Sequence, residues 1–243
     1  MKHFSLALLS LVLMACSTKS LTETEKAEVN DIAVVTFLDN KMPVTYIGST
    51  LFNNEKTDVK VTKWKLNDVL KQAMLKETTR AGRRYIELPI DLKEIKAITK
   101  KNKHPTLRLM DQHDNEVNAY LLKQAAKKGV KYLWVIRPAA HPYYPEQTGY
   151  GLFCRAHLTV DSEWHSYLSF QAVLWDVQGD TKVYQGGINP EVMKTKSADA
   201  CKTVKGSEAI KFAERFKEPV TKMLQNSAGM LYQWAGLAPE PKS

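Results

Sequence analysis

Serine and carboxylate side chains could make this chain a hydrolase, so their surroundings are the first evidence to weigh. Ser49 follows a glycine, but it lacks the G-x-S-x-G sequence that exposes a catalytic serine in α/β-hydrolases. Asp161 and Glu163 fall in one expected turn and Asp176 and Asp180 flank another, so nothing places two acids on facing walls. The sequence also lacks a phosphate-binding loop and a dinucleotide fingerprint. We therefore expect no enzyme, with a hydrolase that lacks these motifs as the less favoured alternative.

Histidine side chains raise the question of a zinc site. His157 and His165 are expected to face each other across a hairpin, and His141 lies in the preceding loop. No carboxylate or helical pair accompanies them at the spacing that zinc sites use. Surface or stacked histidines are the simpler interpretation, so we expect no metal and no other cofactor.

A tyrosine-rich loop at 139–150, AAHPYYPEQTGY, contains two prolines, one glycine and three tyrosines. Tyrosines held between prolines present a stiff amphipathic surface that loses little entropy on binding. Loops on a rigid scaffold often carry function. The residues expected to bind a partner are Tyr143, Tyr144, Arg137, Arg155 and Trp164. The alternatives are that the tyrosines pack as a lid over the end of the sheet and that Trp164 caps the core.

The first sixteen residues join a short basic start to an apolar run that stops at a cysteine. Residues 4–15, FSLALLSLVLMA, are too few to span a bilayer, which takes roughly 20 residues, but they suit a secretory signal peptide. The run ends in Leu13-Met14-Ala15-Cys16, which resembles the lipobox of bacterial lipoproteins. A plain secretory signal followed by a coincidental cysteine is the alternative.

The lipobox resemblance implies a lipid anchor. In that family the cysteine sulfur is acylated and the peptide before it is removed, so signal peptide 1–15 would be lost and Cys16 would become the first residue. Two or three acyl chains hold a protein firmly on a membrane. Lipoproteins kept in the inner membrane have Asp in the next position, and Ser17 therefore implies export to the outer membrane, facing the periplasm. Residues 16–30 are expected to be the lipid anchor and a polar tether.

Two further cysteines, Cys154 and Cys201, remain for the folded part. The periplasm is oxidising, which favours a disulfide between them, and two buried free thiols are the alternative. Lys and Arg total 35 against 26 for Asp and Glu, a net charge of +9. Such a balance is compatible with nucleic acid, anionic lipid or acidic polymers, but we interpret the dispersed cations as a solvated surface and expect no nucleic-acid partner.

The pattern of the mature chain predicts a single α/β (α+β) domain over 31–236, with a disordered tail at 237–243. A mixed sheet should be packed with helices and should end in an antiparallel meander and a long terminal helix. Strands are expected at 31–39, 83–90, 106–109 and 132–138, in an inserted hairpin (44–52, 58–64) and in the meander (151–160, 167–177, 181–188). Helices are expected at 66–81, 91–98 and 114–128 and from Ser207 onward, where Pro219 should kink or split the last one.

Four segments carry a second resemblance: IAVVTFLD, YIELPIDLKEI, KGVKYLWV and LWDVQGDTKVYQG. They resemble the TolB N-terminal-like group of envelope α/β domains, which includes CsgG and the LpoB-type activators of peptidoglycan synthases. A shared fold does not carry a function. We expect a non-enzymatic accessory or scaffolding lipoprotein that docks another envelope protein, or a further copy of itself. The alternative is a binding module for an anionic envelope polymer.

Overall fold

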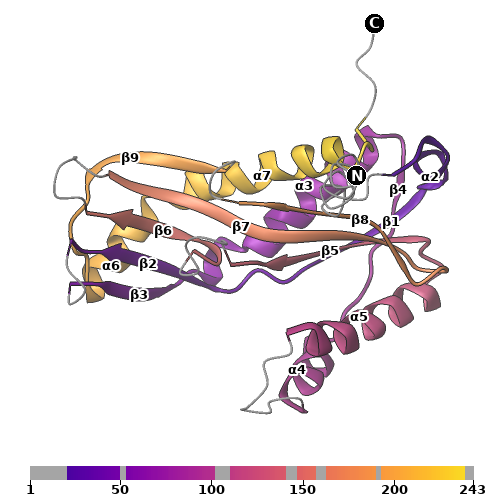
Figure 1. Cartoon of the computed structure of the whole chain (residues 1–243), viewed down its shortest axis with the longest axis horizontal. Helices are drawn as coiled ribbons and strands as arrows, with labels where there is room; N and C mark the ends of the chain where they lie inside the picture. The colour runs from indigo at the N-terminus through magenta and orange to yellow at the C-terminus, as the bar shows by residue number, and fades with distance from the viewer. Residues whose placement is uncertain are drawn as a thin grey trace, which may run out of the picture.

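The computed structural model describes residues 21–49, 53–101, 110–140, 147–156, 163–189 and 193–238. These residues form a mixed sheet of nine strands with helices on both faces (Figure 1). The strands are β1 (Asp31–Thr36), β2 (Lys41–Ile47), β3 (Glu55–Lys60), β4 (Arg84–Tyr85), β5 (Tyr132–Pro138), β6 (Gly149–Arg155), β7 (Glu163–Asp176), β8 (Thr181–Ile188) and β9 (Lys194–Ala200). The expected fold class is confirmed.

Strand β7 organises the whole sheet. The strand order is β3-β2-β6-β7-β5-β1-β4, and β8 and β9 also pair with β7. The first half of β7 lies between β6 and β9, and the second half lies between β5 and β8. The antiparallel meander β6-β7-β8 is as expected, and β2 and β3 form the inserted hairpin.

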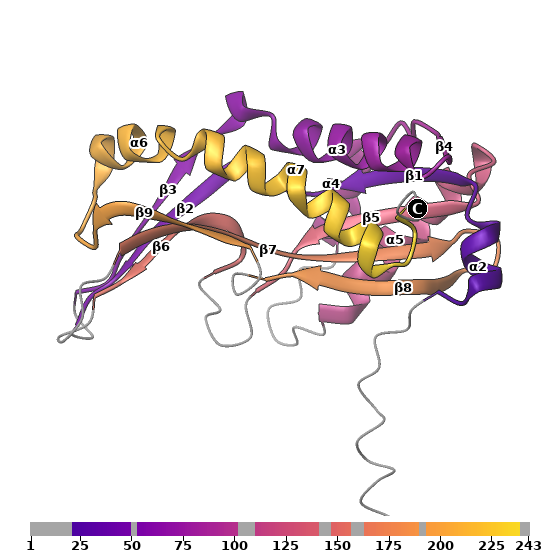
Figure 2. The same ribbon diagram turned by 90° about the horizontal axis from the view of Figure 1, so that it is seen from above.

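The helices divide the core into two layers. Helices α3 (Leu66–Arg80), α6 (Gly206–Glu214) and α7 (Lys217–Trp234) lie along one face of the sheet (Figure 2). Helices α4 (Leu92–Lys101) and α5 (Met110–Lys127) lie beside β1 and β5 on the other face. Along β1, Ile32 and Val34 join the first core while Ala33 and Val35 join the second. A strand buried on both faces needs the unbroken apolar run seen there.

The folded part begins before the expected boundary at residue 31. Thr22 and Glu25 form a reciprocal capping box at the start of α2 (Glu23–Glu28). The flanking Leu21 and Val29 are 4% and 0% exposed and belong to the main core. At the other end, Leu237 is 1% exposed. Both segments are polar in sequence, and a few apolar side chains attach them to the domain.

The segment 189–206, expected as a connection, contains β9. No residue of β9 is buried, because its sequence KTKSADA has almost no apolar side chain. The terminal helix is split, as Pro219 suggested, but the break is at Arg215 and Phe216. Pro219 lies in the first turn of α7, where a missing N–H costs no helical hydrogen bond. The short strand expected at 106–109 lies outside the described residues.

Candidate functional site

The tyrosine-rich loop is held by a hydrogen-bonded stem. Ala140 and Thr148 form an isolated antiparallel bridge, and the Gly149 N–H donates to the Ala139 carbonyl at 3.3 Å. The Ala139 N–H donates to the carbonyl of Ser169 in β7 at 3.0 Å. Tyr143 and Tyr144 lie outside the described residues. The fold nevertheless fixes both ends of their loop to the central strands.

Tyr150, the third tyrosine of the loop, belongs to the core. Its side chain is 2% exposed, and its hydroxyl donates to the Asp39 carbonyl. Burial raises the pKa of this phenol well above its ordinary value. Tyr150 is therefore a core residue and is not available as a surface residue of the loop.

Arg137 stands directly beside the stem. It is the sixth residue of β5, and its Nη2 donates to Oδ1 of Asn118 in α5 at 2.7 Å. Its guanidinium lies over the Phe37 ring, 5.5 Å from the ring centre. Contacts with a helix and with the segment after β1 therefore orient a side chain that the sequence assigned to partner binding.

A polar cleft of 380 Å³ opens at this end of α5. The strand register explains it, because Gln171 lies opposite Arg137 on β5, and Lys182 of β8 lies opposite Trp175. These side chains lie on the same face of the sheet as the apolar residues that pack against α5. The polar residues that line the cleft are Asn115, Asn118, Arg137, Gln171, Lys182 and Gln185.

Sequence reasoning found Arg137 but missed the other polar residues of the cleft. A signal was present in YLSFQAVLWDV, where Gln171 shares the alternation of Val173 and Trp175 and is exposed. A polar residue on an otherwise apolar strand face indicates a place where that face is not packed against apolar side chains. No pattern of neighbouring residues in the sequence predicts that Gln171 lies close to Asn118 of α5.

Arg155 and Trp164 do not join this site. Arg155 ends β6, six residues from Gly149, which separates it from the stem by about 20 Å along the strand. Trp164 is 1% exposed and packs edge-on against Phe212 of α6, with ring centres 5.2 Å apart. Its indole is part of the core, so the core-cap alternative describes it and a surface anchor does not.

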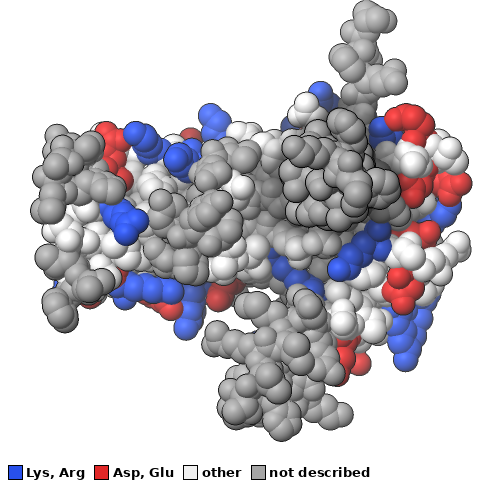
Figure 3. All heavy atoms as spheres, in the orientation of Figure 1, with Lys and Arg blue, Asp and Glu red and all other residues white. Residues whose placement is uncertain are grey.

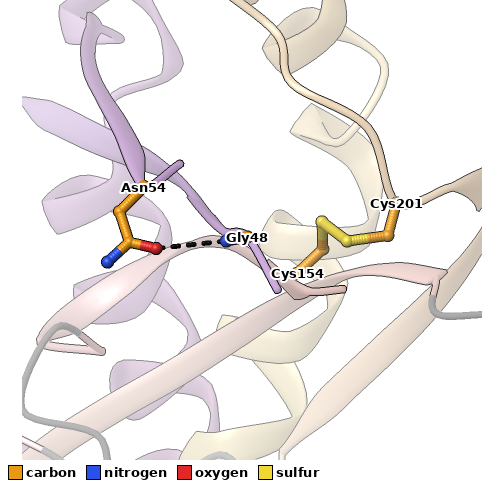
Figure 4. Close-up of a disulfide and its surroundings, with 4 residues drawn as sticks. All are labelled: Gly48, Asn54, Cys154 and Cys201. Carbon is orange, nitrogen blue, oxygen red and sulfur yellow. Dashed lines mark hydrogen bonds between the residues drawn. A yellow bond between two sulfur atoms is a disulfide. The ribbon is translucent and has the colours of Figure 1, made fainter. Parts of the chain in front are cut away.

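The two cysteines form a disulfide that links β6 to the chain after β9 (Figure 4). Cys154 and Cys201 have Cα atoms 5.7 Å apart and are separated by 47 positions in the sequence. Beside them, the Gly48 N–H donates to Oδ1 of Asn54 at 3.1 Å and helps to close the β2–β3 hairpin. Cys16 lies outside the described residues.

Two of the acid residues weighed for catalysis, Asp176 and Glu163, make structural contacts. The Asp176 carboxylate accepts the N–H groups of Gln178 and Gly179 at 3.0 and 3.2 Å and so shapes the turn before β8. Glu163 is 3.6 Å from Lys196 of β9. Asp161 lies outside the described residues.

His165 is half-buried and packs against Phe153, with ring centres 5.4 Å apart. Burial lowers its pKa to about 4, with Lys194 and Lys196 contributing, so the imidazole is neutral at pH 7. His141 and His157 lie outside the described residues. Within the described ranges, no three His, Cys, Asp or Glu side chains gather as a metal site would require.

No family model matches the chain, and no curated protein matches it. Among solved structures, it is similar to lipoprotein GNA1162 from Neisseria meningitidis, at 12% identity and a TM-score of 0.33, over 81% of this chain and 99% of that one. It is similar to the PelC dodecamer from Paraburkholderia phytofirmans, at 10% identity and a TM-score of 0.31, over 86% and 92%. The LpoB C-terminal domain from Salmonella enterica gives 9% identity and a TM-score of 0.24, over 74% and 90%. Similarities this distant assign no function to the chain.

A second hollow follows the two outer helices. This groove of about 1390 Å³ runs between α3 and α7 and reaches Gly236 and Ala238. Its walls carry charges of both signs, including Asp68 and Lys76, around small residues such as Ala73. None of the described helices is long and apolar enough to cross a bilayer.

Proposed function

We propose that this chain is a lipid-anchored, non-enzymatic envelope protein whose α/β domain docks another envelope protein. The anchor is the acylated Cys16. The membrane is the outer membrane, and the domain lies in the periplasm. Anchoring confines the domain to one surface and raises its effective concentration for partners there.

The observation that carries the proposal is the stem of the tyrosine-rich loop. In the sequence, Tyr143 and Tyr144 lie between residues tied to β5, β6 and β7, and Arg137 is oriented next to the stem. A loop with fixed ends has less freedom to lose on binding, and aromatic residues and arginine dominate protein interfaces. The occupied carboxylates of Asp176 and Glu163 support a role without catalysis.

Crosslinking in intact cells tests the proposal. The lipidated wild-type chain should capture one dominant envelope protein, identified by mass spectrometry. The double variant Tyr143→Ala/Tyr144→Ala should lose that capture while its thermal unfolding and its membrane fractionation stay unchanged. Loss is expected because the aromatic anchors of an interface carry most of its binding energy.

Arg155→Ala is the matched control, since Arg155 is an exposed cation of the same sheet about 20 Å along β6 from the stem. It should capture the same protein as the wild type. Capture that survives in the double tyrosine variant, or a wild type with no protein above background, would contradict docking through this loop.

The cleft supports a second candidate, binding of an anionic envelope polymer. Arg137 and Lys182 line it together with amide side chains that can hydrogen-bond a saccharide. Binding through charge should weaken steeply as salt rises, whereas aromatic docking should not. Purified chain mixed with envelope polysaccharide at low and high ionic strength separates the two candidates.

A further inference from the structure

Trp234 is an exposed aromatic residue on a molecule that buries its other tryptophans. Its side chain is 38% exposed, whereas those of Trp64, Trp134, Trp164 and Trp175 are between 0% and 8% exposed. The buried stripe of α7 passes through Leu231 and Tyr232 and continues at Ala235. Trp234, the last residue of α7, lies at the margin of that stripe and leaves part of its indole in solvent.

The end of α7 lies beside α2. Gly236 has a φ of +69°, and a Cβ placed there would overlap the side chain of Lys26 in α2. Figure 2 shows α7 running from α6 toward the end of the molecule that carries α2. Trp234 is therefore close to the point at which the folded part begins.

The chain leaves little distance between that point and the lipid anchor. Only Ser17, Thr18, Lys19 and Ser20 separate Cys16 from the buried Leu21. Five Cα steps of at most 3.6 Å limit the reach to about 18 Å. An acylated Cys16 lies at the membrane surface, so α2 and its neighbours are confined to the layer next to the lipid headgroups.

We propose that the end of the domain formed by α2 and the C-terminal turn of α7 rests on the bilayer, with Trp234 inserted among the lipid headgroups. The inference rests on the proposed acylation of Cys16. Tryptophan suits this layer because its ring is apolar and its N–H is polar. The resulting orientation sets the α6 end of the molecule away from the membrane.

The charge of α2 indicates which kind of lipid headgroup this end of the domain contacts. Figure 3 shows acidic side chains, with basic ones beside them, at the end that carries α2. The helix has three glutamates and a single lysine, and Lys26 is 2.5 Å from Glu23. A helix with this charge is not attracted to anionic lipid. The surface that it contacts is therefore a layer of zwitterionic headgroups, and added salt should not weaken the contact.

Quenching by brominated phosphatidylcholine tests the contact. Lipidated protein is placed in vesicles of this lipid and of ordinary phosphatidylcholine, and tryptophan emission is compared. Wild type should lose emission in the brominated vesicles and Trp234→Phe should not, because the four remaining tryptophans are buried. The loss should persist at high salt and should be absent from the unlipidated Cys16→Ser chain.

Ile210 provides the matched control. It is an exposed large apolar residue, 53% exposed, on α6, at the other end of the row formed by α6 and α7 (Figure 1). The double variant Trp234→Phe/Ile210→Trp moves the exposed indole to that end and should show no quenching by lipid bromine.

The outcomes separate this inference from the proposed function. Mass spectrometry of the purified protein reports acylation independently of fluorescence. An acylated chain whose Trp234 emission is unaffected by bromine, or is affected no more than that of the Ile210→Trp control, overturns the membrane contact and leaves the anchor in place. A chain without acyl groups overturns the anchor and, with it, the inference.

Discussion

At the scale of single residues, burial decides which groups can act. The sequence offers Asn67 or Asp68 as a cap for α3. The Asn67 side chain instead accepts the Leu38 N–H and donates to the Leu38 carbonyl, each at 2.8 Å. The helix is instead preceded by Lys65, whose φ of +51° lies in the left-handed region. A side chain that could have capped its own helix therefore hydrogen-bonds a loop residue 29 positions away in the chain.

His165 gives a prediction at this scale. Its pKa falls from 6.5 to about 4 on folding, because burial disfavours the imidazolium beside Lys194 and Lys196. The unfolded chain takes up the proton first, so this histidine stabilises the fold above pH 6.5, and the contribution is lost as the pH falls toward 4. His165→Gln should therefore lose less stability than wild type between pH 7 and pH 4.5 in urea unfolding. Equal losses in the two proteins would contradict the depressed pKa.

At the scale of elements, β9 shows how a strand can be held without a buried face. It pairs with the first half of β7 and is followed directly by Cys201. Since none of its residues is buried, β9 is held by the ladder hydrogen bonds, the disulfide and the ion pairs of Lys196 with Glu163 and of Asp199 with Arg215. On the chain-entropy model, closing a loop of this length is worth about 4 kcal/mol.

The double variant Cys154→Ala/Cys201→Ala should lower the free energy of unfolding by about 2–4 kcal/mol. Amide hydrogen exchange should accelerate most over 194–200, because local opening of β9 exposes no apolar surface. Strand β8 is the internal control, since it pairs with the same β7 but buries Val183, Tyr184 and Ile188. Equal acceleration in β8 and β9 would show that the disulfide stabilises the whole fold and not β9 in particular.

At the scale of the whole molecule, the terminal segments complete the core. A chain that begins at Asp31 lacks Leu21 and Val29, whose burial contributes roughly 1.5–3 kcal/mol each. We expect that chain to lose about 3–6 kcal/mol relative to one that begins at Leu21, as measured by denaturant unfolding. Equal stability of the two chains would contradict a structural role for α2.

The sequence alone predicted the features that depend on neighbouring residues. The unbroken apolar runs of β1 and β5 are typical of strands buried on both faces, and alternate residues of each strand do join the two cores. Gly82 and Gly129 each follow a helical pattern, where a glycine typically ends the helix, and their φ values of +70° and +68° agree. The lipobox of Cys16 is also local, and it stays a prediction.

Only the tertiary structure decided which distant residues meet. It placed Arg137 beside Asn118 and the loop stem, and it placed Arg155 at the far end of β6 from that stem. It also buried Trp164 against α6. It also added β9 to the sheet and α2 to the core. The physical reason is that backbone conformation follows from nearby side chains, whereas burial and pairing depend on elements many residues apart.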